Sequence, residues 1–360
     1  MTTAKGEGKE EKGNAYFTAS LLILSILTML CWLGLGFFHE AVFTFFGADE
    51  SVLPKVMEYA SWIIAFLPVF IAPTFISSFI RNDGAPGLAM KAVIIGGCVN
   101  IFGDWFLVFP LGLGMRGAAM ATVIGTCVQV GIMCSHFFSK KCGLCLVKPN
   151  NMLHGIRIIV KIGFGAGVLD MGTIVLAIMM NNKIMRYSGS MELAVYGVVA
   201  TITSLFQALF CGVGQAVQPL TSANHGAGNR ERILAFWKMS LLTTIFLGIG
   251  FTVIGEILPL QITRLFMRAT EKELLAAPAI FRQLFLVFIP LGINVLSVYF
   301  LQSILKERES LIIALARSVF ISGALIFLLP LILGIQGVWL ALPVAIMALL
   351  LVRKANKTEE

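Results

Sequence analysis

Long apolar segments alternate with short polar loops along almost the whole chain, and this pattern predicts membrane-spanning helices. A spanning helix needs about 20 mostly apolar residues. Ten segments meet that length, at residues 17–38, 59–80, 92–110, 117–138, 158–181, 193–217, 236–258, 280–305, 311–333 and 335–352. We therefore expect an all-α polytopic membrane protein whose even number of spans places both termini on one side.

Composition supports the same class. Hydrophobic residues make up 58% of the chain and charged residues only 13%, which leaves too little polar surface for a soluble globule. The first fifteen residues are polar and carry both Lys and Glu, so they resemble a loop and not a signal peptide.

The chain contains an internal repeat with an offset of about 220 residues. Matching positions include Gly6, Gly8 and Ser20 with Gly226, Gly228 and Ser240, then Pro68 with Pro290, and Pro110, Gly114 and Gly117 with Pro330, Gly334 and Gly337. A repeat of this length is half a protein. The second copy follows apolar residues 156–220, which have no counterpart before Met1. We therefore predict a truncated first lobe at residues 1–150 and a complete second lobe at residues 151–360.

Basic residues gather in alternate loops, as the positive-inside rule describes. The predicted cytoplasmic loops contain Lys140, Lys141, Lys148, Arg230, Arg232, Lys306, Arg308, Arg353 and Lys354. This distribution explains the net charge of +8 without a nucleic-acid partner. It predicts that both termini are cytoplasmic and that the protein lies in the plasma (inner) membrane. The two copies of the repeat would then have the same orientation and be related by an axis along the membrane normal.

The sequence carries no enzyme signature. It has no Gly-x-Ser-x-Gly, no His-Glu-x-x-His and no phosphate-binding Gly-x-x-x-x-Gly-Lys motif. Cys142 and Cys145 form one Cys-x-x-Cys pair, but no further Cys or His pair follows at ligand spacing, so we expect no metal site. We expect no cofactor either, and any uphill transport would draw its energy from an ion gradient or from a separate subunit.

Polar residues inside the spans are the candidate functional residues, because an ionised carboxylate at bilayer depth costs about 2.5–3.5 kcal/mol. Asn100 and Asp104 lie four residues apart, hence on one helical face. Thr122 lies in the next predicted span at a similar depth. Their oxygens suit Na⁺, and a desolvated Asp104 could carry a proton instead. The alternative is that these residues form structural hydrogen bonds between helices.

A second group of polar residues lies in the predicted second lobe. Asp170 falls near the middle of its predicted span and could attract a cationic substrate. The residues that could line the same substrate cavity are Gln207, Gln215, Gln218 and Asn294, with helix packing as the alternative for each.

Several segments resemble the multidrug and toxic compound extrusion (MATE) family. Asn100-Ile-Phe-Gly-Asp104 with the following residues 110–122 looks like helices five and six of these transporters. Arg81-Asn-Asp-Gly84 resembles the loop after helix four, and residues 212–228 resemble the end of helix eight and its loop.

The resemblance implies twelve helices in two six-helix lobes that rock about a central cavity. Here ten would be present: helices equivalent to 3–6 in the first lobe and 7–12 in the second. It implies export of cationic or amphipathic drugs or metabolites in exchange for Na⁺ or H⁺. In some members an Asp on helix one joins an Asn and Asp on helix five and a Thr on helix six. Asn100, Asp104 and Thr122 match the last three, and the helix-one Asp has no position in this chain.

Two other interpretations stay open. A related flippase for lipid-linked saccharides would need a more basic cavity, whereas this chain offers Asp104 and Asp170. The chain could also be a non-transporting fragment or scaffold. We expect a monomer in the lipid bilayer, and we expect that these 360 residues do not transport by themselves, because two first-lobe helices would be missing.

Overall fold

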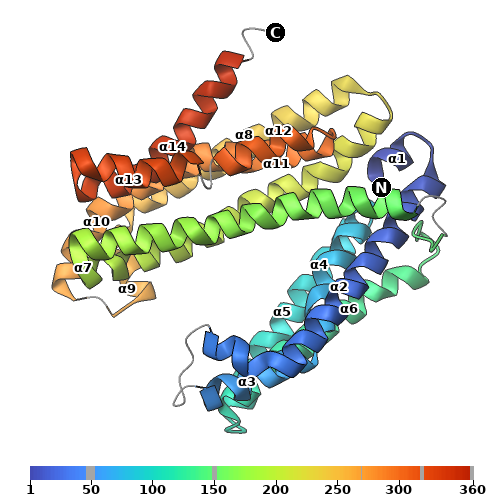
Figure 1. Ribbon diagram of the computed structural model, residues 1–360, viewed down its shortest axis with the longest axis horizontal. Coiled ribbons are helices and arrows are strands. Elements are labelled where there is room, and N and C mark those ends of the chain that lie inside the picture. Colours follow the sequence, from blue (N-terminus) through green and yellow to red (C-terminus); the bar gives the residue numbers. More distant parts are fainter. Residues whose placement is uncertain (46–52, 148–151, 269, 317–319, 357–360) are drawn as a thin grey trace. The chain divides into compact units, whose positions relative to one another are not determined.

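The computed structural model describes residues 1–45, 53–147, 152–268, 270–316 and 320–356, and every regular element in these ranges is a helix (Figure 1). The chain divides into two compact units, Met1–Ile159 and Val160–Glu360. The prediction of an all-α protein is confirmed. The predicted boundary between residues 150 and 151 and its assignment to lobes stay predictions.

The first unit is a bundle of helices that contact one another. Its elements are α1 (Thr2–Gly6), α2 (Glu10–Phe45), α3 (Leu53–Ala65), α4 (Leu67–Asn82), α5 (Pro86–Val108), α6 (Gly114–Cys134) and the 3-10 helix η1 (Ser135–Phe138). Helices α4, α5 and α6 pack against each other, and α2 packs against α3 and α4 (Figure 1). A small core of Ile80, Ala89, Ala92 and Met133 lies between α4, α5 and α6.

The predicted span at residues 59–80 is not straight. The structure splits it into α3 and α4, which meet at an angle of 54°. Pro68 lies in the first turn of α4, where it cannot donate a hydrogen bond to the preceding helix and disfavours helical geometry in the residue before it. The break therefore follows from Pro68, whose effect on the backbone cannot be predicted from the apolar pattern alone.

The second unit contains the longest helix, α7. Its elements are α7 (Met152–Gly226, which begins in the first unit), α8 (Arg230–Ile257), α9 (Pro259–Phe266), α10 (Glu271–Phe285), α11 (Phe288–Ser303), α12 (Glu307–Leu315), α13 (Ile321–Leu333) and α14 (Ile335–Asn356). The predicted spans at 158–181 and 193–217 both fall in α7. They are separated by Gly189, whose φ of 80° and ψ of −166° suit only glycine.

Aromatic rings fill the core of the second unit. Phe206 and Phe251 stack with ring centroids 3.9 Å apart, and Phe288 meets both edge-on. Glycines let the helices approach, since a Cβ on Gly255 would lie 1.8 Å from the Phe285 ring. With Phe210 and Phe281, these rings form the aromatic part of the core, and each buries a large apolar area.

The two units repeat the same local backbone structure. Before α2, the N–H of Lys9 donates to Ala4 at 2.9 Å, and before α8 the N–H of Asn229 donates to Asn224 at 2.9 Å. The glycine preceding each of these donors has a positive φ, 76° at Gly8 and 73° at Gly228. Further along, Gly114 and Gly334 take φ values of 52° and 57°. The predicted internal repeat is therefore present in the fold.

Among the described residues, six helical stretches are long and apolar enough to cross a membrane, and the bent pair α3–α4 makes a seventh. The six are Glu10–Thr44, Pro86–Val108, Gly114–Phe138, Ser190–Gly226, Arg230–Ile257 and Glu271–Ser303. The predicted spans at 158–181, 311–333 and 335–352 include residues or side chains outside the described set. The total of ten spans stays a prediction.

Candidate functional site

Helices α5 and α6 approach so closely that their backbones touch. A Cβ added to Gly125 of α6 would lie 2.7 Å from both the Asn100 Cβ and the Gly96 carbonyl oxygen of α5. A Cβ on Gly96 would lie 2.8 Å from the Gly125 carbonyl oxygen, and further along the pair Gly103 faces the Ala121 methyl. These small residues form a seam, which is how helices pack where no hydrophobic force drives them together.

Two of the predicted ion ligands meet across this seam. The Asn100 Nδ2 donates to the Thr122 Oγ1 at 3.4 Å, and the Thr122 hydroxyl donates to the Ala118 carbonyl at 2.9 Å. The first bond is long and therefore weak. Both side chains are half-buried. The Asn100 amide group and the Thr122 hydroxyl are thus held together on one helix pair.

Asp104 lies one helical turn beyond Asn100 on α5. Its Oδ1 is buried and has no hydrogen-bond partner among the described residues. A buried carboxylate oxygen without a partner costs free energy, so such atoms call for an explanation such as an ion or water. The three residues of the predicted ion site therefore lie along one face of the α5–α6 pair, and one oxygen atom is left available.

The predicted substrate-cavity residues lie on two helices of the second unit. Gln207, Gln215 and Gln218 are half-buried on α7, and their spacing of eight and three residues places them on one face. Asn294 lies in α11 and is only 3% exposed. The Asp170 side chain lies outside the described set.

Contacts between α7 and α11 place these groups in neighbouring helices. The Ser222 hydroxyl donates to the Ser303 carbonyl at 3.1 Å. A Cβ on Gly214 would collide with the Tyr299 ring, and one on Gly292 would lie 2.7 Å from Phe210. The three glutamines of α7 and Asn294 of α11 therefore lie on helices that pack together. Their role as substrate ligands stays a prediction.

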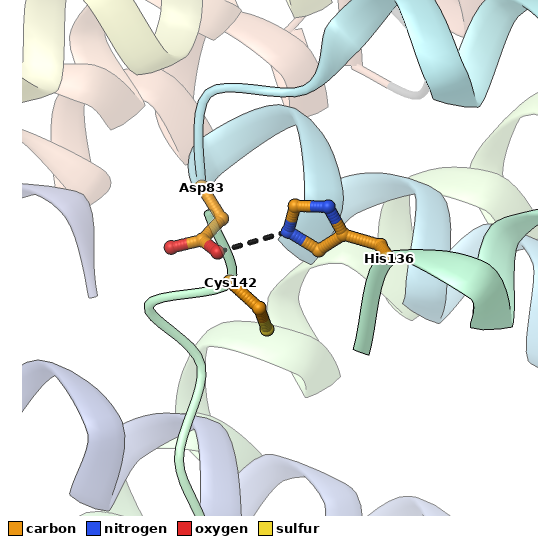
Figure 2. A group of neighbouring side chains, drawn as sticks. All are labelled: Asp83, His136 and Cys142. Carbon is orange, nitrogen blue, oxygen red and sulfur yellow. Dashed lines mark hydrogen bonds and ion pairs between the residues drawn. The ribbon is translucent and has the colours of Figure 1, made fainter. Parts of the chain in front are cut away.

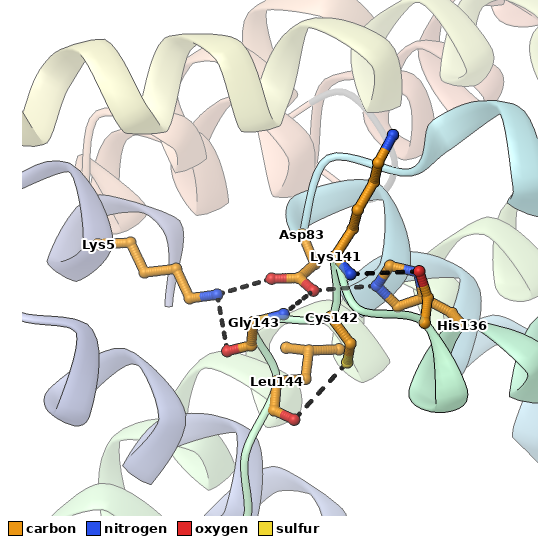
Figure 3. Close-up of polar contacts among 8 residues, drawn as sticks. Lys5, Asp83, His136, Lys141, Cys142, Gly143 and Leu144 are labelled. Carbon is orange, nitrogen blue, oxygen red and sulfur yellow. Dashed lines mark hydrogen bonds and ion pairs between the residues drawn. The ribbon is translucent and has the colours of Figure 1, made fainter.

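A second polar cluster, which the sequence analysis does not predict, surrounds Asp83 at the end of α4 (Figure 3). The Lys5 Nζ donates to Asp83 Oδ1 at 2.7 Å, and the Gly143 N–H donates to Oδ2 at 2.8 Å. The His136 Nε2 lies 2.9 Å from the same Oδ2. We call Lys5, Asp83, His136, Cys142 and Gly143 the loop cluster.

The partners of Asp83 stabilise its charged form. Burial by itself raises the pKa of the Asp83 carboxyl, but the hydrogen bonds from Lys5, His136 and the Gly143 N–H, together with the Lys5 charge, outweigh it. They hold the pKa of Asp83 below its ordinary value. Asp83 is therefore ionised at neutral pH although its side chain is only 4% exposed.

Sequence reasoning missed this cluster for a clear reason. Asp83 and His136 are separated by 53 positions and belong to different elements, and no spacing rule for helices or loops connects them. The available signal was partial: Asp83 lies in the Arg81–Gly84 segment, and Cys142 lies in the Cys-x-x-Cys pair. Only the packing of α4 against α6 brings the two segments together.

The MatE family model matches two segments of the chain, residues 1–106 and 168–328. Rabbit (Oryctolagus cuniculus) multidrug and toxin extrusion protein 2 is 26% identical over 141 residues, which are 39% of this chain and 23% of that protein. Multidrug export protein MepA of Staphylococcus saprophyticus is 24% identical over 228 residues, 62% of this chain and 49% of that protein. The matches thus span about half the length of these curated relatives or less.

Solved structures of transporters share the fold. An outward-facing multidrug resistance MATE family transporter of the MOP superfamily superposes with a TM-score of 0.89 at 19% identity, over 98% of this chain and 79% of that chain. A MOP superfamily transporter from Pyrococcus furiosus gives a TM-score of 0.88 at 19% identity over the same shares. Because the family model matches well over half of the chain and the helical fold agrees with it, this chain is a multi-pass membrane protein of the MatE family of transporters.

Proposed function

We propose that the protein is a secondary active efflux transporter that exports cationic or amphipathic compounds in exchange for Na⁺ or H⁺. The coupling ion would bind at Asn100, Asp104 and Thr122. The observation that carries this proposal is the buried Asp104 Oδ1, which has no hydrogen-bond partner among the described residues and lies one turn from the Asn100–Thr122 pair.

A purely structural role fits Asn100 and Thr122 better than it fits Asp104. Interhelical hydrogen bonds explain an amide beside a hydroxyl, but they do not explain a carboxylate oxygen that forms none within the described chain. Na⁺ would satisfy that oxygen together with the amide and hydroxyl oxygens, since it prefers such hard ligands. A proton on Asp104 would satisfy it by removing the charge.

The candidate cavity residues support a cationic or amphipathic substrate. The candidate cavity residues of the second unit are one acid, Asp170, and four uncharged amides, Gln207, Gln215, Gln218 and Asn294. Three of the amides are half-buried on one face of α7. On that face their polar groups could hydrogen-bond to a bound molecule while the apolar side chains around them contact its apolar part. The curated relatives named above are a toxin extrusion protein and a multidrug export protein.

The flippase alternative differs in the charge of its cavity. One solved structure of the same fold is described as having a binding pocket of reversed polarity that suggests a different function for that protein. Pocket charge therefore discriminates between the two proposals. Asp104 and Asp170 favour cations in this chain, whereas an anionic lipid-linked saccharide would be repelled.

The test replaces Asp104 by Asn, which keeps the size of the side chain and removes its charge. We expect ion binding to the purified chain to weaken at least about tenfold, the equivalent of about 1.4 kcal/mol. In a version that carries a complete first lobe, we expect the same change to abolish efflux of a cationic dye from drug-sensitised cells. Glu58→Gln is the matched control. It makes the same chemical change in the same unit at a side chain that is 44% exposed.

The outcomes separate the interpretations. Normal ion binding and full dye efflux by Asp104→Asn, at equal protein level in the membrane, would leave Asp104 with a structural role only. Dye efflux by the version with a complete first lobe, driven by a Na⁺ gradient or by a pH gradient, identifies the coupling ion. Transport of an anionic lipid in place of the dye would favour the flippase.

A further inference from the structure

Three side chains that commonly bind transition metals meet in the loop cluster. In Figure 2 the Asp83 carboxylate and the His136 ring face each other with Cys142 beside them, and the ligand atoms of all three residues lie within 4.8 Å of one another. They offer one carboxylate oxygen, one imidazole nitrogen and one sulfur. This site is separate from Asn100, Asp104 and Thr122. Its nitrogen and sulfur ligands also differ from the oxygen ligands of those residues.

The three ligands come from separate segments of the first unit. Asp83 follows α4, His136 lies in η1 and Cys142 lies in the loop after η1. Asp83 and His136 have side chains that are only 4% exposed, and Cys142 is half-buried. Ionisable groups are rarely buried to this extent unless they are paired or bind a metal.

The fold itself does not require a carboxylate at this turn. At the end of α4, the N–H of Asp83 donates to Phe79, and that of Ala85 donates to Ile80. The end of α11 in the second unit makes the same pair of bonds, from Ile304 to Phe300 and from Lys306 to Leu301. Isoleucine therefore occupies the equivalent position to Asp83 in the other copy of the repeat. The acid at residue 83 serves something other than the turn.

We propose that Asp83, His136 and Cys142 form a transition-metal site, and that Zn²⁺ is the ion that fits it best. Zinc binds Cys, His and Asp in tetrahedral sites, whereas Na⁺, Mg²⁺ and Ca²⁺ avoid sulfur. Cys145 follows Cys142 at the Cys-x-x-Cys spacing of zinc sites and is exposed. It or a water molecule would complete the coordination.

Binding requires only small side-chain movements. Cys142 Sγ contacts the Leu144 carbonyl at 3.7 Å, a weak interaction that a metal easily replaces. The Cys142 thiol would release its proton to solvent and bind as the thiolate. The His136 Nε2 proton, which bonds to Asp83 in the metal-free protein, would also leave, and the neutral ring would bind through Nε2 with its proton on Nδ1. Lys5 and the Gly143 N–H already hold the Asp83 carboxylate and would remain as its outer partners.

The site would fasten two connections of the first unit to each other. It joins the α4–α5 turn to the segment that follows α6, both on the side predicted to be cytoplasmic. Thiols stay reduced in the cytosol, so Cys142 would be available there. The ion would thus stabilise the end of the unit at which α1 and the loop after η1 meet α4.

The test uses the purified full chain in detergent after treatment with a chelator, titrated with Co²⁺ as a spectroscopic substitute for Zn²⁺. A cysteine ligand gives a thiolate-to-cobalt charge-transfer band, and we expect it to saturate at a single equivalent and to disappear when Zn²⁺ is added. In a Cys145→Ser background, where Cys142 is the remaining cysteine of the site, Cys142→Ser should abolish the band. Cys98→Ser, at an exposed cysteine of α5, should retain it.

Variants at His136 separate a ligand from a structural hydrogen-bond partner. His136→Gln can still bond to Asp83 but cannot replace the imidazole as a ligand, so Co²⁺ binding should weaken by more than the roughly 10–100-fold that losing an outer partner costs. His136→Cys supplies a new metal ligand and should restore binding. Lys5→Met removes only an outer partner of Asp83 and should weaken binding by no more than about 10–100-fold. Cys145→Ser distinguishes Cys145 from water as the fourth ligand.

Helix content and a monodisperse elution profile establish that each variant is folded. If Cys142→Ser does not fold, the pair His136→Gln and His136→Cys decides. The proposal is overturned if the native chain shows no charge-transfer band, if the band survives Cys142→Ser in the Cys145→Ser background, or if His136→Gln binds Co²⁺ as tightly as the native chain.

Discussion

Asp83 and Asp104 are two acids of the first unit with opposite surroundings. Asp83 receives hydrogen bonds from Lys5, from the Gly143 N–H and from His136. Asp104 has a buried Oδ1 without a partner among the described residues. A satisfied carboxylate stabilises the structure around it, whereas an unsatisfied one is poised to bind something. The two acids therefore call for different experiments.

Replacing Asp83 by Asn should destabilise the chelator-treated protein by about 1–3 kcal/mol at neutral pH, because charge-assisted hydrogen bonds are lost. The pKa of Asp83 is lowered in the folded state, so its contribution is fully present above the ordinary carboxyl pKa of about 4 and is lost as the pH falls through the lowered value. Thermal unfolding of both proteins across pH measures the difference, which should shrink in acid.

Glu256→Gln serves as the control for this measurement, since Glu256 pairs with Arg282 through side chains that are 39% and 62% exposed. Such surface pairs contribute little. An Asp83→Asn protein as stable as the Glu256→Gln protein at neutral pH would show that the loop cluster does not stabilise the fold.

At the residue scale, the sequence predicts local relations well. Asn100 and Asp104 are four residues apart on one helix, so their common face follows from helical geometry alone. Thr122 is predicted from its depth, and the structure places its hydroxyl beside Asn100. The 53 residues between Asp83 and His136 lie beyond any such rule, because their contact depends on how whole helices pack.

At the scale of elements, glycine decides how closely α5 and α6 approach. Gly96 and Gly125 place one backbone directly against the other, and neither could carry a side chain without displacing its neighbour. Gly97, next to Gly96 on the same helix, has open space around it. These two glycines of α5 therefore differ in role although they are adjacent in sequence.

Gly125→Ala should destabilise the protein by about 1–3 kcal/mol, because the new methyl group would lie 2.7 Å from the Asn100 Cβ. It should also weaken ion binding by displacing Asn100. Gly97→Ala should stabilise the protein by about 0.5–1 kcal/mol, since alanine is the better helix former and nothing obstructs it. Unfolding temperatures in detergent compare the two, and equal shifts would rule out a tight seam.

The predicted elements are correct in type, but the apolar pattern does not reveal their interruptions. An apolar run predicts a helix and carries no information on bends, so it misses the break between α3 and α4 although Pro68 marks the place. Likewise, Gly189 interrupts α7 with a non-helical backbone conformation, and helical residues lie directly on both sides of it. Hydrophobicity sets where helices lie, and single Pro and Gly residues set how they bend.

At the scale of the whole molecule, the alternation of Lys and Arg predicts the orientation in the membrane. In a cysteine-less background, Lys141→Cys and Arg308→Cys should be shielded from a membrane-impermeant thiol reagent in intact cells, and Lys183→Cys should be labelled. Permeabilised cells provide the control, because all three positions should then react. Labelling at residue 141 from outside would reverse the predicted topology.

The internal repeat is the most reliable large-scale prediction. Turn glycines such as Gly8 and Gly228 need a positive φ, so they persist in both copies and mark corresponding positions. The side chains around these turns are not bound by the same requirement. For this reason the repeat can be predicted from the sequence. Only the structure shows that Asp83 and Ile304 occupy equivalent positions and that Asp83 contacts Lys5, His136 and Gly143.

The seam between α5 and α6 constrains how an ion could act as a signal. The candidate ion ligands are carried by two helices whose backbones touch at Gly96 and Gly125. At this contact no compressible layer of side chains separates α5 from α6. The ligands are Asn100, Asp104 and Thr122. An ion bound there cannot work as a wedge that opens the pair. The ion would instead act through charge. A bound cation neutralises Asp104, which lowers the free-energy cost of exposing the rigid α5–α6 pair to the hydrocarbon of the bilayer.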